Sequence, residues 1–296
     1  MTDTSAPVFI IGGSRTGSEM LKTMLSASAE LDFVDELFLY CPRWLHKDLA
    51  SNISQHVGSL SEPGARDALI KLLYSGIPYG WFWANASNQL SRDMLEHELA
   101  DSDLDMRELF RAIMVVHASM HGKMGTGAKF PLHFSSAGRL LEWFPNCRII
   151  QATRNPKAVY ASQSAKYLTN DQSTVSKSLS RFQQFVHINI QTTWTARIHE
   201  RLAGNENYRL VRYEDMVLSP REQLVKLCEF LAVDFDENML RPKQYGSSFN
   251  EIAGGQGVSR SSLERWRTST SSMSQCLMDL LHGRAYRILG YDERCL

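Results

Sequence analysis

The sequence lacks an excess of charge of either sign, and it lacks any long apolar run. Lys and Arg number 32, Asp and Glu also number 32, and the formal net charge of the 296 residues is zero. Proteins that bind duplex nucleic acid or an anionic membrane through a broad basic face carry a clear positive excess. We therefore expect neither partner, although a few well-placed cations could hold a small anion. No apolar stretch approaches the ~18 residues that a membrane span requires, so no membrane insertion is expected.

Cysteine is scarce, and features of a targeting segment are missing. The five cysteines are far apart and form no Cys-x-x-Cys pair, which argues against structural zinc and thioredoxin-like redox chemistry. The apolar run from Ala6 to Ile11 is short and follows Asp3 instead of a basic segment, unlike a signal peptide. We expect a cytoplasmic protein with reduced thiols.

The beginning of the chain has the pattern of a strand, a glycine loop and a helix. Residues 8–11 are apolar and lie between Pro7 and Gly12-Gly13, as expected of a buried strand that enters a tight turn. Apolar residues then recur at helical spacing, from Met20 to Leu25. Similar short apolar segments alternate with helical patterns along the rest of the chain.

This alternation predicts an α/β fold with three layers, α/β/α, around a central parallel sheet. Further strands are expected at 31–34, near 127–131, at 147–153 and at 208–213. Helices are expected at 67–74, 92–120, 139–144, within 154–167 and at 178–202. Ser219, Pro220 and Glu222 predict the start of another helix, with Ser219 as its N-cap. We expect a single domain over 1–296, in which a helical insertion at roughly 37–125 caps the substrate site.

Parallel sheets bind their ligands beyond the carboxyl ends of the strands. Polar or glycine-rich segments stand at each such end in this sequence. They are Gly12 to Ser18, Asp35-Glu36, Lys129, Arg154 and Tyr213.

The glycine loop has the outer spacing of a Walker A motif but not its chemistry. Gly12 and Gly17 are placed like the outer glycines, while Ser18 and Glu19 stand where a lysine and a hydroxyl would hold a triphosphate and Mg²⁺. The cation has moved inside the loop, to Arg15. Loop amides and a helix N-terminus still favour an anion. The alternative is a tight turn without a ligand.

A second anion element follows the strand at 147–153. Arg154 stands at the strand end, and Ser162 lies eight positions later, about two turns into the next helix. Arg154 can reach back toward the Ser162 hydroxyl, with Lys166 one turn further on the same face, and the three could grip a phosphate. The alternative is an ordinary helix start with a surface serine.

With these two motifs, the sequence resembles the sulfotransferases that use 3′-phosphoadenosine 5′-phosphosulfate (PAPS). Their phosphosulfate loop of the type Pro-Arg-Ser-Gly-Thr-Thr is similar to residues 14–19, and their Arg-x7-Ser element is similar to Arg154 through Ser162. Residues 211–217 and 261–267 are similar to further family segments. The resemblance implies a P-loop-NTPase-like fold, PAPS as co-substrate, adenosine 3′,5′-bisphosphate (PAP) as product, and no metal.

The resemblance also implies which residues bind the nucleotide. The loop would bind the 5′-phosphosulfate, Arg154 and Ser162 the 3′-phosphate, and a glycine-rich stretch within 250–259 would close over it. The implied cofactor-binding residues are Gly13, Ser14, Arg15, Thr16, Gly17, Ser18, Arg154, Ser162, Lys166, Tyr213, Gly255, Gln256, Gly257 and Arg265.

The catalytic pattern is most similar to that of tyrosylprotein sulfotransferases and related bacterial enzymes. They carry a glutamate base 21 positions after the loop arginine, and 36 − 15 = 21 places Glu36 there. Their Lys-x-Pro element corresponds to Lys129 through Pro131. Glu36 is thus implied as general base, with Arg15 and Lys129 stabilising the transferred group. Alternatives are a carboxylate at a helix N-terminus and a solvated strand-end lysine.

Two loop positions depart from the family pattern. Ser14 replaces a proline, and Glu19 replaces a hydroxyl that helps to hold the phosphosulfate. A carboxylate beside an anion is unfavourable unless it points away or meets a cation. Separately, His117 and His121 are four residues apart on a helix with no acidic ligand motif nearby, so we expect no metal there.

The function expected is transfer of a sulfuryl group from PAPS to a hydroxyl of a small molecule, sugar, lipid or peptide. Alternatives are a non-catalytic protein that binds PAP or another nucleotide, and a P-loop small-molecule kinase, which the missing Walker lysine disfavours. The aromatic residues at 79–83 are interpreted as core or cap lining.

Overall fold

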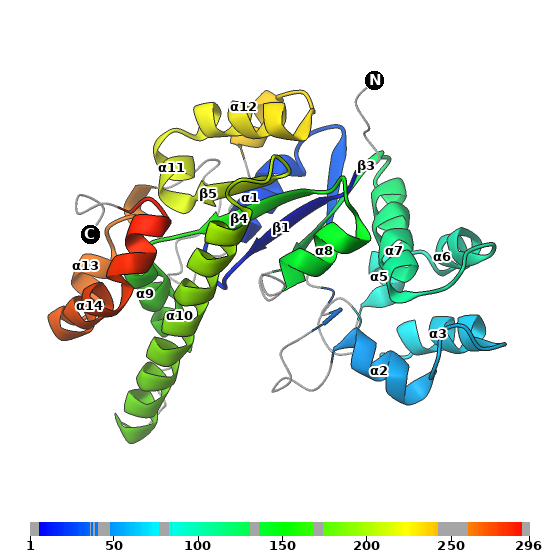
Figure 1. Ribbon diagram of the computed structural model, residues 1–296, viewed down its shortest axis with the longest axis horizontal. Coiled ribbons are helices and arrows are strands. Elements are labelled where there is room, and N and C mark those ends of the chain that lie inside the picture. The colour runs from blue at the N-terminus through cyan, green and yellow to red at the C-terminus, as the bar shows by residue number, and fades with distance from the viewer. Residues whose placement is uncertain are drawn as a thin grey trace. The chain divides into compact units, whose positions relative to one another are not determined.

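The computed structural model describes residues 6–35, 37, 39–40, 48–76, 83, 85–130, 136–167, 174–241 and 260–291. The strands form one parallel sheet in the order β2-β3-β1-β4-β5, flanked by helices, which confirms the predicted α/β fold (Figure 1). The strands are β1 (Val8–Gly12), β2 (Leu31–Asp35), β3 (Gly125–Phe130), β4 (Arg148–Thr153) and β5 (Tyr208–Arg212).

Strand β1 is central because both of its faces are apolar. All five of its residues are buried, as expected of a parallel strand covered on both sides. It pairs with β3 so that Ile10 lies opposite Lys129, and β2 pairs with β3 so that Asp35 lies opposite Lys129. This register places Lys129 at the carboxyl end of its strand.

Two compact units make up the chain: Met1–Ile11 with Ser28–Ile149, and Gly12–Ala27 with Ile150–Leu296. The helices of the first unit are α2 (Leu49–His56), α3 (Ala65–Leu73), α5 (Ala86–Gln89), α6 (Arg92–Leu99), α7 (Met106–Met120) and α8 (Ala137–Trp143). The single-domain assignment and the capping role of residues 37–125 remain predictions.

Helix α7 carries the core of the first unit. It packs against β2, β3 and α6, and α6 packs in turn against α3. Phe110 of α7 stacks on Phe9 of β1, with ring centroids 5.6 Å apart, and Phe144 closes the same cluster. The sequence pattern at 92–120 thus covers two helices, because Asp105 accepts the Glu108 N–H as N-cap and starts α7 anew.

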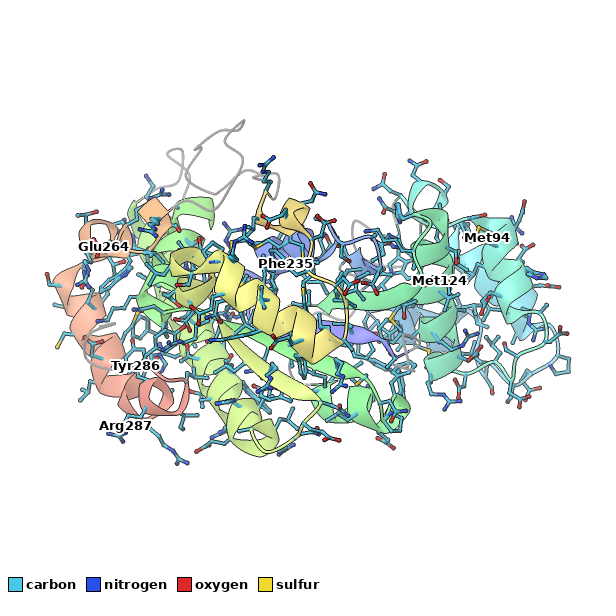
Figure 2. The ribbon with its side chains drawn as sticks, turned by 90° about the horizontal axis from the view of Figure 1, so that it is seen from above. Met94, Met124, Phe235, Glu264, Tyr286 and Arg287 are labelled. Carbon is cyan, nitrogen blue, oxygen red and sulfur yellow. The ribbon has the colours of Figure 1, made fainter. Side chains whose placement is uncertain are left out.

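The second unit is built around the long helix α10. Its helices are α1 (Ser18–Leu25), α9 (Pro156–Tyr167), α10 (Thr174–Leu202), α11 (Tyr213–Leu218), α12 (Pro220–Leu231), α13 (Trp266–Ser269) and α14 (Ser272–Ile288), with short 3-10 turns at Glu237–Leu240 and Arg260–Ser262. Helix α10 packs against α9 and α14 (Figure 1). Figure 2 marks Tyr286 and Arg287 near the end of α14.

One strand was predicted one residue too long. Tyr213 begins α11 and does not end β5. Ser219 is the N-cap residue of α12, as predicted, although its side chain makes no cap hydrogen bond and its N–H donates to the Asp215 carbonyl of α11 at 2.9 Å. Pro220 does start α12, as predicted. Within the described residues, no helix is both long and apolar enough to cross a bilayer.

Candidate anion-binding site

The loop between β1 and α1 has positive φ angles at several positions, and glycine occupies two of them. Gly12 and Gly17 have φ angles of 151° and 93°, and Arg15 adopts the left-handed region at 67°. A Cβ at Gly17 would lie 2.5 Å from the Tyr213 ring, so this position has no room for a side chain. The Thr16 hydroxyl donates to the Gly13 carbonyl at 2.8 Å. The backbone is thereby held in one shape ahead of the N-terminus of α1, where Ser18 is buried.

Gln191 of α10 stabilises this loop through hydrogen bonds. The sequence analysis did not predict this contact. The Ser14 N–H donates to Gln191 Oε1 at 3.2 Å, and Gln191 Nε2 donates to the Ser14 carbonyl at 3.1 Å. A Cβ at Gly13 would lie 1.8 Å from Gln191 Nε2. Because 177 residues separate the partners, no local pattern could indicate this contact.

The two anion elements that the sequence nominated meet through their side chains. Arg15 Nε donates to the Ser162 hydroxyl at 3.0 Å, and Ser162 is buried in α9. Glu19, the doubtful loop position, lies 2.8 Å from Lys22 on the next turn of α1. The ammonium group of Lys22 thus pairs with the Glu19 carboxylate and reduces its repulsion of an anion bound at the loop.

Arg154 lies at the end of β4 in an aromatic and polar setting. Its guanidinium carbon is 4.2 Å from the centroid of the Tyr213 ring, and its Nη2 donates to the Ser262 carbonyl at 2.8 Å. The Tyr213 hydroxyl is 2.6 Å from the Ser262 hydroxyl. The Nε of Arg154 is buried and has no hydrogen-bond partner among the described residues. Arg265 stands directly before α13 and is half-buried.

Glu214, next to Tyr213, holds the turn that follows Arg154, and it too was missed. Its Oε1 accepts the Asn155 N–H at 2.9 Å, and its Oε2 accepts the Tyr291 hydroxyl at 3.0 Å. Burial raises the pKa of the Glu214 carboxyl, and these hydrogen bonds offset the effect only in part. A half-buried acid thus fixes the start of α9.

Lys157, one position into α9, anchors the helix start to the C-terminal part of the same unit. Its Nζ is 2.6 Å from an Asp279 oxygen and 4.9 Å from the centroid of the Trp266 ring. Because Lys157 is buried and paired with Asp279, its role is structural and not the binding of a ligand from solvent.

In the first unit, Lys129 is buried at the end of β3. Its Nζ lies 2.7 Å from Asp35 Oδ1, the carboxylate opposite it in the strand register. Only 3 % of Lys129 is exposed, which argues against the alternative of a solvated strand-end lysine. Asp35 is an ion-pair partner that the sequence analysis did not assign. Trp83 is buried and donates from Nε1 to the Leu37 carbonyl at 2.7 Å, as expected of a core residue.

Several predicted site residues fall outside the described residues. They are Glu36, Gly255, Gln256 and Gly257, together with the side chain of Lys166, whose backbone lies in α9.

The sequence has no acidic ligand motif near His117 and His121, but the fold brings the carboxylate of Asp32 to both of them. Asp32 Oδ2 lies 2.6 Å from His117 Nδ1 and 2.9 Å from His121 Nδ1. Asp32 stands on β2, and α7 packs on that strand, so the fold supplies a carboxylate that is distant in sequence. Burial would raise the pKa of the Asp32 carboxyl, but the two histidines and Lys123 together hold it below its usual value.

Comparison with known proteins gives consistent matches. The model of the sulfotransferase family matches residues 7–237. Protein-tyrosine sulfotransferase A of Caenorhabditis elegans is 24% identical over 247 residues, which are 81% of this chain and 53% of that protein. This chain therefore spans about half the length of that curated relative.

Two solved structures have a similar fold. The sulfotransferase domain from the curacin biosynthetic pathway has a TM-score of 0.57 at 18% identity and covers 97% of this chain and 98% of its own. The sulfotransferase domain from the Synechococcus PCC 7002 olefin synthase has a TM-score of 0.56 at 19% identity, with 97% and 95% covered. At such identities these structures establish the fold and not the substrate.

Replacing Gln191 should loosen the glycine loop. Gln191→Met keeps the length of the side chain but removes both hydrogen bonds to the Ser14 peptide, so the free energy of unfolding should fall by about 1–3 kcal/mol. Urea denaturation measures this fall. Gln183→Met, on an exposed face of α10, is the matched control. Equal losses in both variants would show that Gln191 does not support the loop.

Replacing Glu214 should change how stability depends on pH. An acid whose pKa is raised on folding favours the folded state while protonated, so its contribution is lost as pH rises from the ordinary value of 4.5 through the raised pKa. Glu214→Gln should abolish that loss while keeping an acceptor for the Asn155 N–H. Urea denaturation at a series of pH values, with exposed Glu229→Gln as control, tests this; parallel pH profiles of wild type and Glu214→Gln would contradict it.

Proposed function

Since this chain belongs to the sulfotransferase family, we propose that it transfers a sulfuryl group from PAPS to a hydroxyl of an acceptor. The observation that carries the proposal is the hydrogen bond from Arg15 to Ser162. It joins the glycine loop to the Arg-x7-Ser helix, so one nucleotide that carries a 5′-phosphosulfate and a 3′-phosphate on its ribose can reach both elements. A turn without a ligand would not need a second cationic element beside it.

In this proposal the second unit holds the nucleotide. Loop amides from Gly13 to Ser18 and the Arg15 side chain bind the 5′-phosphosulfate, because amides at a helix N-terminus favour an anion. Arg154 and Ser162 bind the 3′-phosphate, and the buried Nε of Arg154 has hydrogen-bonding capacity for it. Tyr213 supports the Arg154 guanidinium from one face. Lys166, Arg265 and the segment with Gly255, Gln256 and Gly257 are further proposed contacts.

The chemistry proposed is an in-line displacement at sulfur. The acceptor oxygen forms a bond to sulfur, the bond from sulfur to the 5′-phosphate oxygen breaks, and PAP leaves. The acceptor proton passes to the Glu36 carboxylate as general base. Arg15 and Lys129 stabilise the charge that grows on the sulfuryl and leaving oxygens. Asp35, 2.7 Å from Lys129, favours the charged form of this lysine and fixes its direction.

The acceptor class stays open among small molecules, sugars, lipids and peptides. The similarity to a protein-tyrosine sulfotransferase makes a tyrosine peptide the first acceptor to test.

An initial screen compares the thermal stabilisation of the chain by PAP, by ATP with Mg²⁺ and by buffer alone. Stabilisation by PAP without metal, followed by turnover of radiolabelled PAPS on an acceptor panel, supports the proposal. PAP binding without any turnover would favour a non-catalytic nucleotide-binding protein, and stabilisation by ATP with Mg²⁺ alone a kinase.

Replacing Glu36 should separate chemistry from binding. Glu36→Gln removes the base but keeps size and polarity, so turnover of PAPS should fall by about a hundredfold to ten thousandfold while PAP affinity is kept. Radiolabelled transfer and calorimetric PAP titration measure the two quantities, with exposed Glu62→Gln as control. Loss of PAP affinity in Glu36→Gln would assign Glu36 a structural role instead.

Replacing Arg154 should be selective for the 3′-phosphate. Arg154→Ala should weaken PAP by about tenfold to a hundredfold, the size of a lost charged hydrogen bond, and should affect an analogue lacking the 3′-phosphate far less. Calorimetric titration of both nucleotides measures the difference, and exposed Arg197→Ala is the control. An equal loss for both nucleotides would refute the assignment of Arg154.

A further inference from the structure

Three potential metal ligands meet in the first unit, and none of them is among the residues assigned to sulfuryl transfer. His117 lies in the last turn of α7, and His121 follows directly after that helix. Four residues apart, they share one face of the helix, and this face meets Asp32 on β2. One ligand atom from each residue, a ring nitrogen or a carboxylate oxygen, lies within 4.8 Å of the other two.

We propose that Asp32, His117 and His121 bind a divalent transition-metal ion of the zinc and cobalt class. Two imidazole nitrogens with one carboxylate oxygen suit these ions and do not suit Ca²⁺ or Mg²⁺, which prefer oxygen ligands alone. Three protein ligands leave a fourth position for water.

The direction of the buried imidazole fits convergence on a shared ion. His117 Nδ1 is buried and 2.6 Å from Asp32 Oδ2, and no other polar group among the described residues pairs with it. Asp32 and His117 are both buried, whereas the side chain of His121 is 52% exposed. The buried pair provides a fixed base for the ion, and the exposed histidine provides the path by which the ion enters.

Binding requires only a small movement of the ligand atoms. Metal bonds of about 2.0–2.1 Å in a tetrahedral site separate neighbouring ligand atoms by about 3.3 Å. The present separations from Asp32 Oδ2 are 2.6 Å and 2.9 Å, so the atoms must spread by roughly half an ångström. His121 can supply much of this movement because it stands after the helix end and faces solvent.

A nearby cation limits the affinity. Lys123 donates from Nζ to the Leu31 carbonyl at 2.9 Å, next to Asp32 in the chain, and its charge opposes a dication. The residue lies in the short link between α7 and β3, which Met124 marks in Figure 2. Removing this charge should therefore strengthen metal binding, whereas removing a ligand should weaken it.

The site is distinct from the residues proposed for catalysis. Asp32 pairs with Thr126 near the start of the ladder, whereas Asp35 pairs with Lys129 at its end. The two aspartates are three residues apart, so they lie about 10 Å apart along the strand and point to opposite faces. A metal bound at Asp32 would fasten the end of α7 to β2, and its role would be structural.

The test uses the full chain, first treated with a chelator and then titrated with Co²⁺. Visible absorption should show one bound ion with nitrogen and oxygen ligands, and Zn²⁺ should displace it and raise the melting temperature. Loss of a second-sphere partner already costs metal sites about tenfold to a hundredfold. Replacing a direct ligand in His121→Gln should therefore weaken Co²⁺ binding by at least about a hundredfold.

Two further variants make the result decisive. His97→Gln, an exposed histidine on α6, should bind Co²⁺ like the wild type, and Lys123→Gln should bind it more tightly. Equal affinity in wild type and His121→Gln, absence of saturable binding, or an absorption band of a cysteine thiolate bound to cobalt would each overturn the proposal.

Discussion

The turn between β1 and α1 depends on the absence of side chains at its glycines. A Cβ at Gly12, Gly13 or Gly17 would meet the Ala152 carbonyl, the Gln191 amide group or the Tyr213 ring, each within 2.5 Å. These contacts come from β4, α10 and α11, so the turn is enclosed by elements remote in sequence. This crowding aligns the loop amides with the N-terminus of α1, and the proposed binding of the phosphosulfate depends on that alignment.

Within each unit, the cations proposed for the site are held by neighbouring groups before any ligand binds. Arg15 contacts Ser162, Arg154 lies against Tyr213 and Ser262, and Lys129 lies against Asp35. A preorganised cation loses less conformational freedom when it binds an anion. The chain as a whole is neutral, with 32 basic and 32 acidic residues. Its basic residues therefore attract an anion through their local arrangement and not through the net charge of the protein.

The predictions that proved correct rest on short segments. The apolar run at 8–11, ended by two glycines, predicted a buried strand, and the alternation that follows it indicated a parallel sheet. Tyr213 was assigned to the wrong element because α11 begins directly after β5, with no residue between them. Gln191, Glu214 and Asp32 were missed as partners because each acts on a residue at least 59 positions away.

The sequence by itself determined the fold class, the glycine loop, the family resemblance and the identity of Arg15, Lys129, Arg154 and Ser162 as candidates. These depend on periodicity and on spacing within one segment, which local sterics and burial dictate. Only the tertiary structure decided that Arg15 meets Ser162, that Gln191 bonds to the loop, and that Asp32 joins His117 and His121. Most of these pairings are set by how strands and helices pack side by side, because packing brings together residues that no sequence period relates.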